Sequence, residues 1–381
     1  MRKYKFNYSN LLIYLFSIII FCGMITYSMV PLSSLFVQVR YALIIVLFVL
    51  AVATQKHSIK QWIYFLIGSS ITMISVVVTQ IGLEYFFMIL AIFSISTISP
   101  KKIMKFSAIM IAITLIFLTI SSWLRVIPNL IFYRDNIIRQ SWGTIYPLIL
   151  AGYIFYANAA WISSKQNDKK KYMGEVLLIL ISAVLVFRVT GARNDTFAII
   201  LLLGSYLINM ISDRYNKAIL TSGIVIIFAI LFLSIFITQL LPYYSNSFNW
   251  VNNLFNHRLV LQYTLFEYYA PKLFGQYIPQ VGAGGSTNNA GYYFYIDNSY
   301  TRLLFMYGIV FTIFILIMLL NYLRNLMEIK AYSLVYILLI VIASGIAEDA
   351  FVNPVINVFL YLLLENRDLL LQDFGSRSEG F

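Results

Sequence analysis

Residues 218–237 read AILTSGIVIIFAILFLSIFI, a run without a charged side chain. Residues 239–298, which follow it, read QLLPYYSNSFNWVNNLFNHRLVLQYTLFEYYAPKLFGQYIPQVGAGGSTNNAGYYFYIDN and carry charged, amide and glycine residues throughout. An apolar run of about 20 residues can cross a bilayer as a helix, because each backbone group bonds within the segment. The first stretch therefore predicts a transmembrane helix, and the second predicts one large polar loop.

The composition extends this prediction to the whole chain. Of 381 residues, 61% are hydrophobic and 11% are charged, and the mean hydropathy is +0.82. A soluble protein of this length needs more charge to cover its surface, and long apolar runs without alternation favour helices over a barrel. We expect an all-α, polytopic integral membrane protein in which residues 1–381 form a single transmembrane domain, with residues 239–298 as a large extracellular loop within it. About twelve spans are expected, with ten or eleven as alternative counts, at residues 11–30, 36–54, 62–79, 83–98, 103–121, 144–162, 173–189, 195–211, 218–237, 299–321, 331–346 and 350–365.

The lysines give these spans an orientation. With the N-terminus in the cytoplasm, thirteen of the fourteen lysines fall on the cytoplasmic side, and only Lys272 is external. This distribution follows the positive-inside rule, so both termini are expected inside and the 239–298 loop outside. The net charge of +12 is then explained by topology and by contact with anionic membrane lipid, and we expect no nucleic-acid partner.

The arginines do not follow the lysines. Eight of the thirteen fall on the outer side or at outer helix ends: Arg40, Arg125, Arg134, Arg139, Arg188, Arg193, Arg258 and Arg302. A guanidinium is a planar, permanently charged fork that binds phosphate through two hydrogen bonds. The segregation predicts an outward-facing pocket for a phosphate-bearing ligand. The alternative is that these side chains snorkel to the interface or pair with Asp135, Asp195 and Asp297.

Two short outer segments carry four of these arginines. Arg134 and Arg139 are five residues apart in an amphipathic pattern that predicts a short interfacial helix, with Arg134 as a surface anchor and Arg139 as the better pocket candidate. Arg188 and Arg193 flank a tight turn at Gly191. That turn places them near the N-terminus of the next helix, where free N–H groups and the helix dipole favour an anion. The alternative for this pair is that both bind Asp195.

The polar loop and the last outer turn supply candidate acid–base groups. A pattern of apolar residues after His257 and Arg258 predicts a helix lying on the membrane surface. We expect the remainder of the loop to be flexible, with a mobile lid over a substrate as the alternative. Glu348 and Asp349 lie in the last outer turn, where one could be a general base or both could be helix-terminal charges. Since Cys22 is the only cysteine and the outer residues form no His or carboxylate cluster, no metal site is expected.

Several of these residues form patterns that resemble a known family. The chain is similar to the Wzy-type polysaccharide polymerases and, more distantly, to the O-antigen ligases. Most of the chain takes part, through the span number, the position of the large loop and these motifs: Arg139, Gly143 and Pro147 entering a span; Thr190, Gly191 and Arg193 at a turn; Arg258 in the loop; Asp297 to Tyr300 before Tyr307 and Gly308. The chain departs from the family where Leu148 follows Pro147, a position that often holds asparagine.

The resemblance implies a membrane glycosyltransferase with a GT-C-like architecture in a bacterial plasma membrane. Its substrate would be a polyprenyl-diphosphate-linked oligosaccharide on the outer face, and it would need neither cofactor nor metal. Arg193 and Arg258 would bind the diphosphate with support from Arg139 and Arg188. One of His257, Glu348 and Asp297 would deprotonate the acceptor hydroxyl. A chain-length regulator and a flippase are the partners that this function implies.

Two other functions fit the same arginines. A lipid-linked oligosaccharide flippase would hold a diphosphate during alternating access, and a ligase would hand finished polymer to another acceptor. The sequence shows no internal repeat, and its charges lie outside the middle of the spans, which argues against a transporter. The polymerase is therefore the preferred hypothesis.

Overall fold

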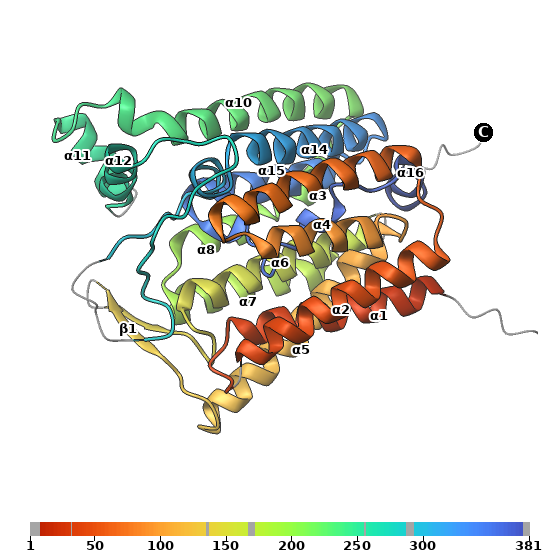
Figure 1. Ribbon diagram of the computed structural model, residues 1–381, viewed down its shortest axis with the longest axis horizontal. Helices are drawn as coiled ribbons and strands as arrows, with labels where there is room; N and C mark the ends of the chain where they lie inside the picture. Colours follow the sequence, from red (N-terminus) through yellow and green to blue (C-terminus); the bar gives the residue numbers. More distant parts are fainter. Residues whose placement is uncertain are drawn as a thin grey trace, which may run out of the picture.

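The computed structural model describes residues 8–31, 33–134, 137–166, 172–254, 257–286 and 293–375. Within these ranges the chain is predominantly helical, and the helices run along the long axis of the molecule (Figure 1). Seven helices are long and apolar enough to cross a membrane: α1 (Tyr8–Thr26), α2 (Ser33–Thr54), α3 (Ile59–Thr79), α5 (Pro100–Trp123), α7 (Tyr172–Thr190), α10 (Asp213–Leu240) and α14 (Ile309–Glu328). The prediction of a helical protein compatible with a membrane is confirmed at this level.

Three further helices fill the centre of the bundle: α4 (Leu83–Ile95), α6 (Pro147–Lys165) and α15 (Tyr332–Ala347). α15 is buried along nearly its whole length and packs against α10, α14 and α6. Such burial requires apolar residues on all faces, which is why its sequence shows no polar stripe. This central helix ends at Glu348, and therefore carries that residue to one end of the bundle.

The span expected at residues 350–365 is not a continuous helix, and this prediction is wrong. The segment holds two 3₁₀ turns, η2 (Asp349–Phe351) and η3 (Val358–Leu362). Asn357 fixes its path by donating to the carbonyl of Phe351 at 2.7 Å and accepting from the amide of Phe359 at 3.0 Å. The segment is nonetheless buried and apolar. A hydropathy profile therefore cannot distinguish it from a transmembrane helix.

The span expected at residues 195–211 is divided into α8 (Arg193–Leu201) and α9 (Gly204–Ile208). Tyr336 of α15 occupies the break, where its hydroxyl donates to the carbonyl of Leu201 at 3.1 Å. A Cβ atom on Gly204 would lie 2.3 Å from that hydroxyl, so only glycine fits there. The count of about twelve spans is therefore not confirmed.

The interfacial helix expected around Arg134 and Arg139 is also wrong. Residues in this region form an antiparallel hairpin of β1 (Ile131–Arg134) and β2 (Ile137–Gln140), in which Phe132 pairs with Arg139. β-Branched and aromatic residues dominate both strands and favour the extended backbone. The chain is therefore not strictly all-α.

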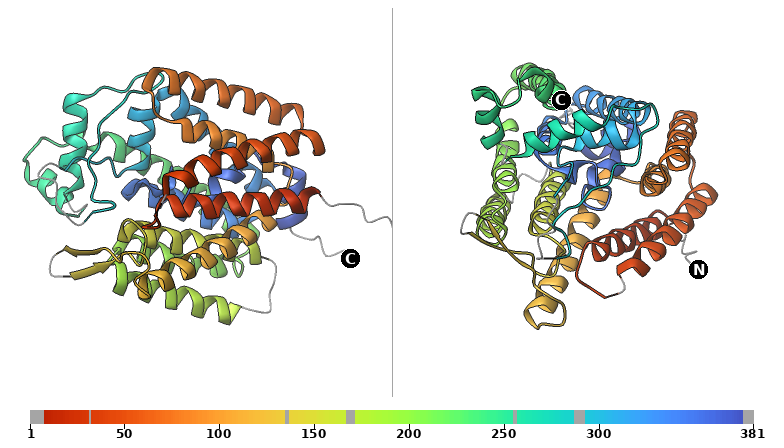
Figure 2. Two further views of the ribbon diagram at one scale, coloured as in Figure 1. Left: turned by 60° about the horizontal axis from the view of Figure 1, so that its bottom comes forward. Right: turned by 60° about the vertical axis from the view of Figure 1, so that its left-hand side comes forward.

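The polar loop is built around two helices, α11 (Asn246–Leu254) and α12 (Arg258–Tyr268), so the helix predicted after His257 is present. Together with the hairpin it gathers at one end of the bundle, and α16 (Arg367–Phe374) lies at the other (Figures 1 and 2). The loop returns to the bundle through α13 (Ser299–Arg302) and the π-helical turn η1 (Leu303–Tyr307). Its polar residues therefore collect above the ends of the long helices.

Backbone hydrogen bonds attach this loop to the start of α14. The amides of Ile309 and Val310 donate to the carbonyls of Lys272 and Leu273 at 3.0 and 3.1 Å. The first N–H groups of a helix have no partner within it, so the loop supplies the acceptors that α14 needs. This part of the loop is a fixed structural element.

Gly308→Ala is expected to destabilise the protein by about 2 kcal/mol or more, because Gly308 lies at the crossing of the loop and α14. Its φ is +97°, and a Cβ atom there would lie 2.3 Å from the amide nitrogen of Gly275. Thermal unfolding in detergent tests this, with Gly174→Ala as the matched control, since a Cβ at Gly174 meets nothing within 4 Å. Equal unfolding temperatures for the two variants would contradict the conclusion that this position requires glycine.

Candidate functional site

A cationic pocket lies at the end of the bundle that carries the hairpin. It forms where the hairpin, the turn between α7 and α8, α12 and the end of α15 meet. Four arginines and one carboxylate contribute to its lining, which comprises Arg134, Ile137, Arg139, Leu148, Gly191, Ala192, Arg193, Asn194, Arg258 and Glu348. The excess of guanidinium groups makes an anion the ligand that this pocket favours.

Arg139 forms the inner wall of the pocket and is 4% exposed. Its Nε donates to the carbonyl of Thr190 at 2.5 Å, while its buried Nη2 has no acceptor among the described residues. Gly191 adopts the left-handed backbone of the turn, at φ +60°, and lies against the Arg139 stem. Burial lowers the pKa of Arg139, because a buried cation without a carboxylate partner is poorly solvated. An unpaired, oriented N–H of this kind is suited to bind an oxyanion.

Arg193 and Arg134 are exposed side chains that also line the pocket. Arg193 is the first residue of α8, whose N-cap residue, Ala192, supplies no side-chain cap. The N–H groups at that helix end and the Arg193 guanidinium both favour an anion at this side of the pocket. Arg134 comes from β1. The structure places it at the pocket, although the sequence favoured a role as a membrane anchor. The strand register places Arg134 and Arg139 on the same face of the hairpin, which a helical interpretation could not show.

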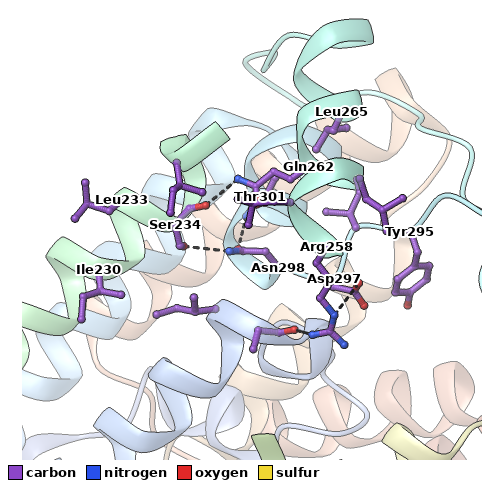
Figure 3. Close-up of a pocket in the computed structure, with 16 residues that line it drawn as sticks. Ile230, Leu233, Ser234, Arg258, Gln262, Leu265, Tyr295, Asp297, Asn298 and Thr301 are labelled. Carbon is purple, nitrogen blue, oxygen red and sulfur yellow. Dashed lines mark hydrogen bonds and ion pairs between the residues drawn. The ribbon is translucent and has the colours of Figure 1, made fainter. Parts of the chain in front are cut away.

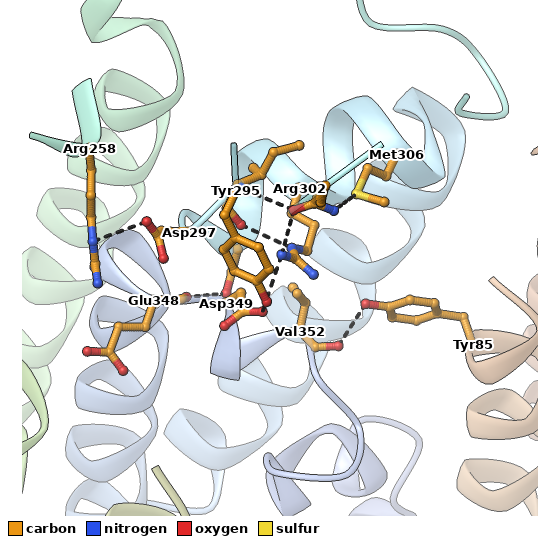
Figure 4. A network of polar contacts seen from close by, with 12 residues as sticks. Tyr85, Arg258, Tyr295, Asp297, Arg302, Met306, Glu348, Asp349 and Val352 are labelled. Atoms are coloured by element: carbon orange, nitrogen blue, oxygen red, sulfur yellow. Dashed lines mark hydrogen bonds and ion pairs between the residues drawn. The ribbon is translucent and has the colours of Figure 1, made fainter. Parts of the chain in front are cut away.

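Arg258 holds the first turn of α12 against the bundle. Its Nε lies 3.2 Å from Oδ2 of Asp297, and its Nη1 donates to the carbonyl of Ala347 at the end of α15 (Figures 3 and 4). Burial lowers the pKa of Arg258, but the nearby carboxylates of Asp297 and Glu348 raise it above its usual range. Pairing with Asp297 was the alternative that the sequence left open for this arginine, and it is present. The guanidinium also reaches the pocket, so the two interpretations are compatible.

Asp297 is a buried carboxylate whose ion pair does not fully compensate its burial. Burial raises the pKa of Asp297 to about 6, even though Arg258 acts in the opposite direction. The folded protein therefore binds a proton more tightly than the unfolded chain. As a consequence, this group destabilises the fold as pH rises through the range between its ordinary pKa and about 6.

The stability of the wild type relative to Asp297→Asn is expected to fall by at most about 3 kcal/mol as pH rises from about 4 to 7, because the asparagine variant lacks this ionisation. Thermal unfolding of both proteins in detergent across this pH range measures the difference. The comparison removes the contributions of other titrating groups, since both proteins share them. A relative stability that increases with pH would show instead that the attraction of Arg258 exceeds the cost of burial.

Among the described residues that line the cationic pocket, Glu348 is the only carboxylate. It is 7% exposed, and its backbone carbonyl accepts from the hydroxyl of Ser299 at 2.6 Å. Its carboxyl lies near that of Asp195, which is 3% exposed and lies in the first turn of α8. Burial raises the pKa of Glu348, and the positive charge of Arg258 acts against this shift. Two buried carboxyl groups close together resist ionising at the same time, so the pair can hold a proton at the pocket.

The adjacent carboxylate, Asp349, belongs to a different network. Its Oδ2 accepts from the hydroxyl of Tyr295 at 2.6 Å and lies 3.4 Å from Nη2 of Arg302 (Figure 4). Arg302 also donates to the side chain of Gln280 at 2.9 Å. These bonds fasten the end of the polar loop to the turn after α15. Arg302 and Asp349 therefore have a structural role, which is to hold the loop to this turn.

An apolar cavity of about 250 Å³ adjoins the cationic pocket (Figure 3). Its walls come from α10, α12, residues 295–298 and the end of α15, and Arg258 lines both spaces. Gln262 joins the two helices by donating to the carbonyls of Ser234 and Ile235 at 2.8 and 2.7 Å. Ile230 and Leu233, on the α10 wall, are about half exposed at the side of the bundle. The combined site therefore offers an apolar groove that leads to a cluster of guanidiniums.

The structure brings together Arg139, Arg193, Arg258 and Glu348 from the predicted set, with Asp297 behind Arg258. Two predicted residues are not among those that line either space. Arg188 is exposed on α7, and His257 is exposed beside Asn252, with Nδ1 3.2 Å from the amide nitrogen. Arg188 lies on α7 and Arg193 begins α8, so the turn between the two helices separates these side chains although they are only five residues apart.

Two residues of the site were not predicted as members. Arg134 could have been found only from the strand pairing, and Asp195 only from its contact with a residue 153 positions away in the chain. Of the remaining outer arginines, Arg40 forms an ion pair with Glu84 at 2.9 Å. Among the residues that the structure describes, no three His, Cys, Asp or Glu side chains come together as a metal site would require.

Comparison with known proteins does not assign a function to this site. A scan against protein-family models finds no match for the chain, and a search of curated proteins also finds none.

Proposed function

We propose that this protein lengthens a cell-surface polysaccharide by glycosyl transfer between polyprenyl-diphosphate-linked oligosaccharides. One observation carries the proposal: a pocket lined by four arginines adjoins an apolar cavity, and Arg258 belongs to both. A polyprenyl diphosphate has the same two parts, an anionic head and an apolar chain. The exposed apolar residues of α10 give the chain a route from the lipid into the cavity.

The reaction exchanges one C–O bond for another. The bond between the anomeric carbon and the diphosphate oxygen breaks, and a new bond forms between that carbon and the hydroxyl oxygen of the acceptor sugar. Polyprenyl diphosphate leaves with the bonding electron pair, and guanidiniums oriented before the reaction stabilise the charge that develops on it. In the part of the chain that the structure describes, the guanidiniums of Arg139 and Arg193 form no ion pair, so they can bind the diphosphate without leaving a carboxylate partner.

Glu348 is the preferred base for the acceptor hydroxyl. It lines the cationic pocket and lies near Asp195, whereas Asp297 forms an ion pair with Arg258 and His257 lies outside the pocket lining. The hydroxyl proton would pass to the deprotonated carboxylate of Glu348 as the new bond forms. Burial raises the pKa of Glu348, and this favours the proton transfer.

We further propose that the long helices cross a bacterial plasma membrane with both termini in the cytoplasm. Support comes from the turns after α2, α4 and α14, which carry lysines in or next to them and lie at the end of the bundle opposite the hairpin and the polar loop (Figure 2). The cationic pocket would then open at the outer face. A twelve-span, GT-C-like architecture and partnership with a chain-length regulator and a flippase remain predictions that follow from the resemblance.

Purified protein in lipid vesicles, supplied with a polyprenyl-diphosphate oligosaccharide, tests the proposal. A ladder of products that differ by one repeat unit is the expected result. Movement of the lipid-linked repeat across the vesicle membrane without lengthening would identify a flippase instead. A single transfer to a different acceptor would identify a ligase.

A further inference from the structure

A second polar cavity lies at the end of the bundle opposite the cationic pocket. It has a volume of about 370 Å³ and lies between the start of α3, the last turns of α14 and the turn that precedes α16. The proposed glycosyl transfer does not use it. Its lining has an uneven distribution of charge that identifies a class of ligand.

The inner part of this cavity holds two unsatisfied polar side chains. Glu365 is 7% exposed, and neither of its carboxyl oxygens has a hydrogen-bond partner in the described part of the chain. Tyr322 is 1% exposed, and its hydroxyl also has no partner there. An unbonded buried carboxyl is costly when it is ionised and also when it is protonated, since its O–H then lacks an acceptor. A ligand that donates several hydrogen bonds would satisfy both residues.

The rim of the cavity has the opposite charge. Lys60, Arg324 and Arg367 line it and are exposed, and of the described rim residues beside them only Glu328 is a carboxylate. That carboxylate lies 2.9 Å from Nε of Arg324 and 3.2 Å from Nη2 of Arg367. One carboxylate against three cations leaves an excess of positive charge, which favours an anionic group at the entrance.

We propose that this cavity binds a phosphoethanolamine group, with the primary ammonium against Glu365 and Tyr322 and the phosphate at the rim. An ammonium has three N–H donors, and the two carboxyl oxygens and the tyrosine oxygen are three acceptors. Lys60 and Arg367 bind the phosphate. Met318, Leu363 and Leu364 supply an apolar wall for the carbon atoms that adjoin it.

Two sources share this chemistry, a phospholipid headgroup and a soluble phosphoethanolamine ester. The protein is reconstituted in vesicles of phosphatidylethanolamine, phosphatidylcholine and phosphatidylglycerol in equal amounts, and the lipids that it retains after detergent extraction are counted by native mass spectrometry. Phosphatidylcholine lacks N–H donors and phosphatidylglycerol lacks the cation. We expect the protein to retain about 10-fold more phosphatidylethanolamine than either of the other two lipids. One set of charge-assisted hydrogen bonds contributes about this factor to binding.

Glu365→Gln is expected to reduce this selectivity by about 10-fold, because it removes the charge that binds the ammonium. Asp368→Asn, an exposed carboxylate at the start of α16 that does not line the cavity, is the matched control and should retain the wild-type selectivity. Tyr322→Phe removes one acceptor without adding a polar atom, and a several-fold reduction is expected. This variant provides an independent test of the site if the Glu365→Gln variant does not fold.

Soluble glycerophosphoethanolamine distinguishes the two sources. An increase in the unfolding temperature with this ester, in protein that retains no lipid, supports the site with a soluble ligand. Selective lipid retention without such an increase supports it with a membrane ligand. Equal retention of the three lipids together with no response to the ester overturns the proposal. These measurements do not involve glycosyl transfer, so their result is separate from that of the polymerisation assay.

Discussion

Arg193→Lys is expected to lower the rate of polymer formation by about 100-fold or more, because in the proposed reaction this guanidinium stabilises the leaving diphosphate. Lysine keeps the positive charge but cannot make the paired hydrogen bonds of a planar fork. Arg193 is exposed at the pocket, so its replacement should leave folding intact. The measurement is the rate of chain lengthening in vesicles, normalised to the amount of reconstituted protein.

Arg188→Lys provides the matched control for this result. Arg188 is also exposed and lies only five residues away, but it does not line the cationic pocket. A rate within about twofold of the wild type is expected, as for a surface substitution away from a functional site. A similar loss of activity in the two variants would show that membrane insertion or surface charge, not diphosphate binding, explains the effect.

Glu348→Gln is expected to lower the rate of polymer formation by about 100- to 10,000-fold, since it removes the group that accepts the proton. Glutamine has nearly the same volume, so the packing at the end of α15 is preserved. The pH profile adds an independent readout. Burial raises the pKa of Glu348, and the base acts only when deprotonated, so wild-type activity should rise with pH from the acid side.

His257→Gln separates this assignment from its main competitor. His257 is exposed and is not among the residues that line either cavity, so its replacement should change the rate by no more than about twofold. The two variants are measured in the same vesicle assay. A large loss with His257→Gln and near-normal activity with Glu348→Gln would transfer the role of base to the histidine.

The class of fold and part of the site could be predicted from residue chemistry alone. Apolar runs predicted helices compatible with a membrane because the backbone must satisfy its own hydrogen bonds there. The contrast between lysine and arginine positions indicated a site at one end. Arg139, Arg193 and Arg258, far apart in the chain, do lie together.

The errors arise where contacts between distant residues decide the local structure. Residues 350–365 are as apolar as a helix that crosses a membrane, but Asn357 bonds to its neighbours' backbone and keeps the segment irregular. Tyr336 interrupts the helix after Leu201 in a comparable way. The pairing of Glu348 with Asp195 depends on how α15 and α8 approach each other. No pattern within either segment contains that information.

The double attachment of Arg258 links access to the site with its reactivity. Since this guanidinium is bonded to Asp297 and to the end of α15, α12 cannot swing away without withdrawing a positive charge from the cationic pocket. An open site would then stabilise a departing diphosphate less well than a closed one. Water enters most easily when the site is open, so the activated sugar would be protected from hydrolysis at that moment. One salt bridge would thereby limit wasteful cleavage of the donor.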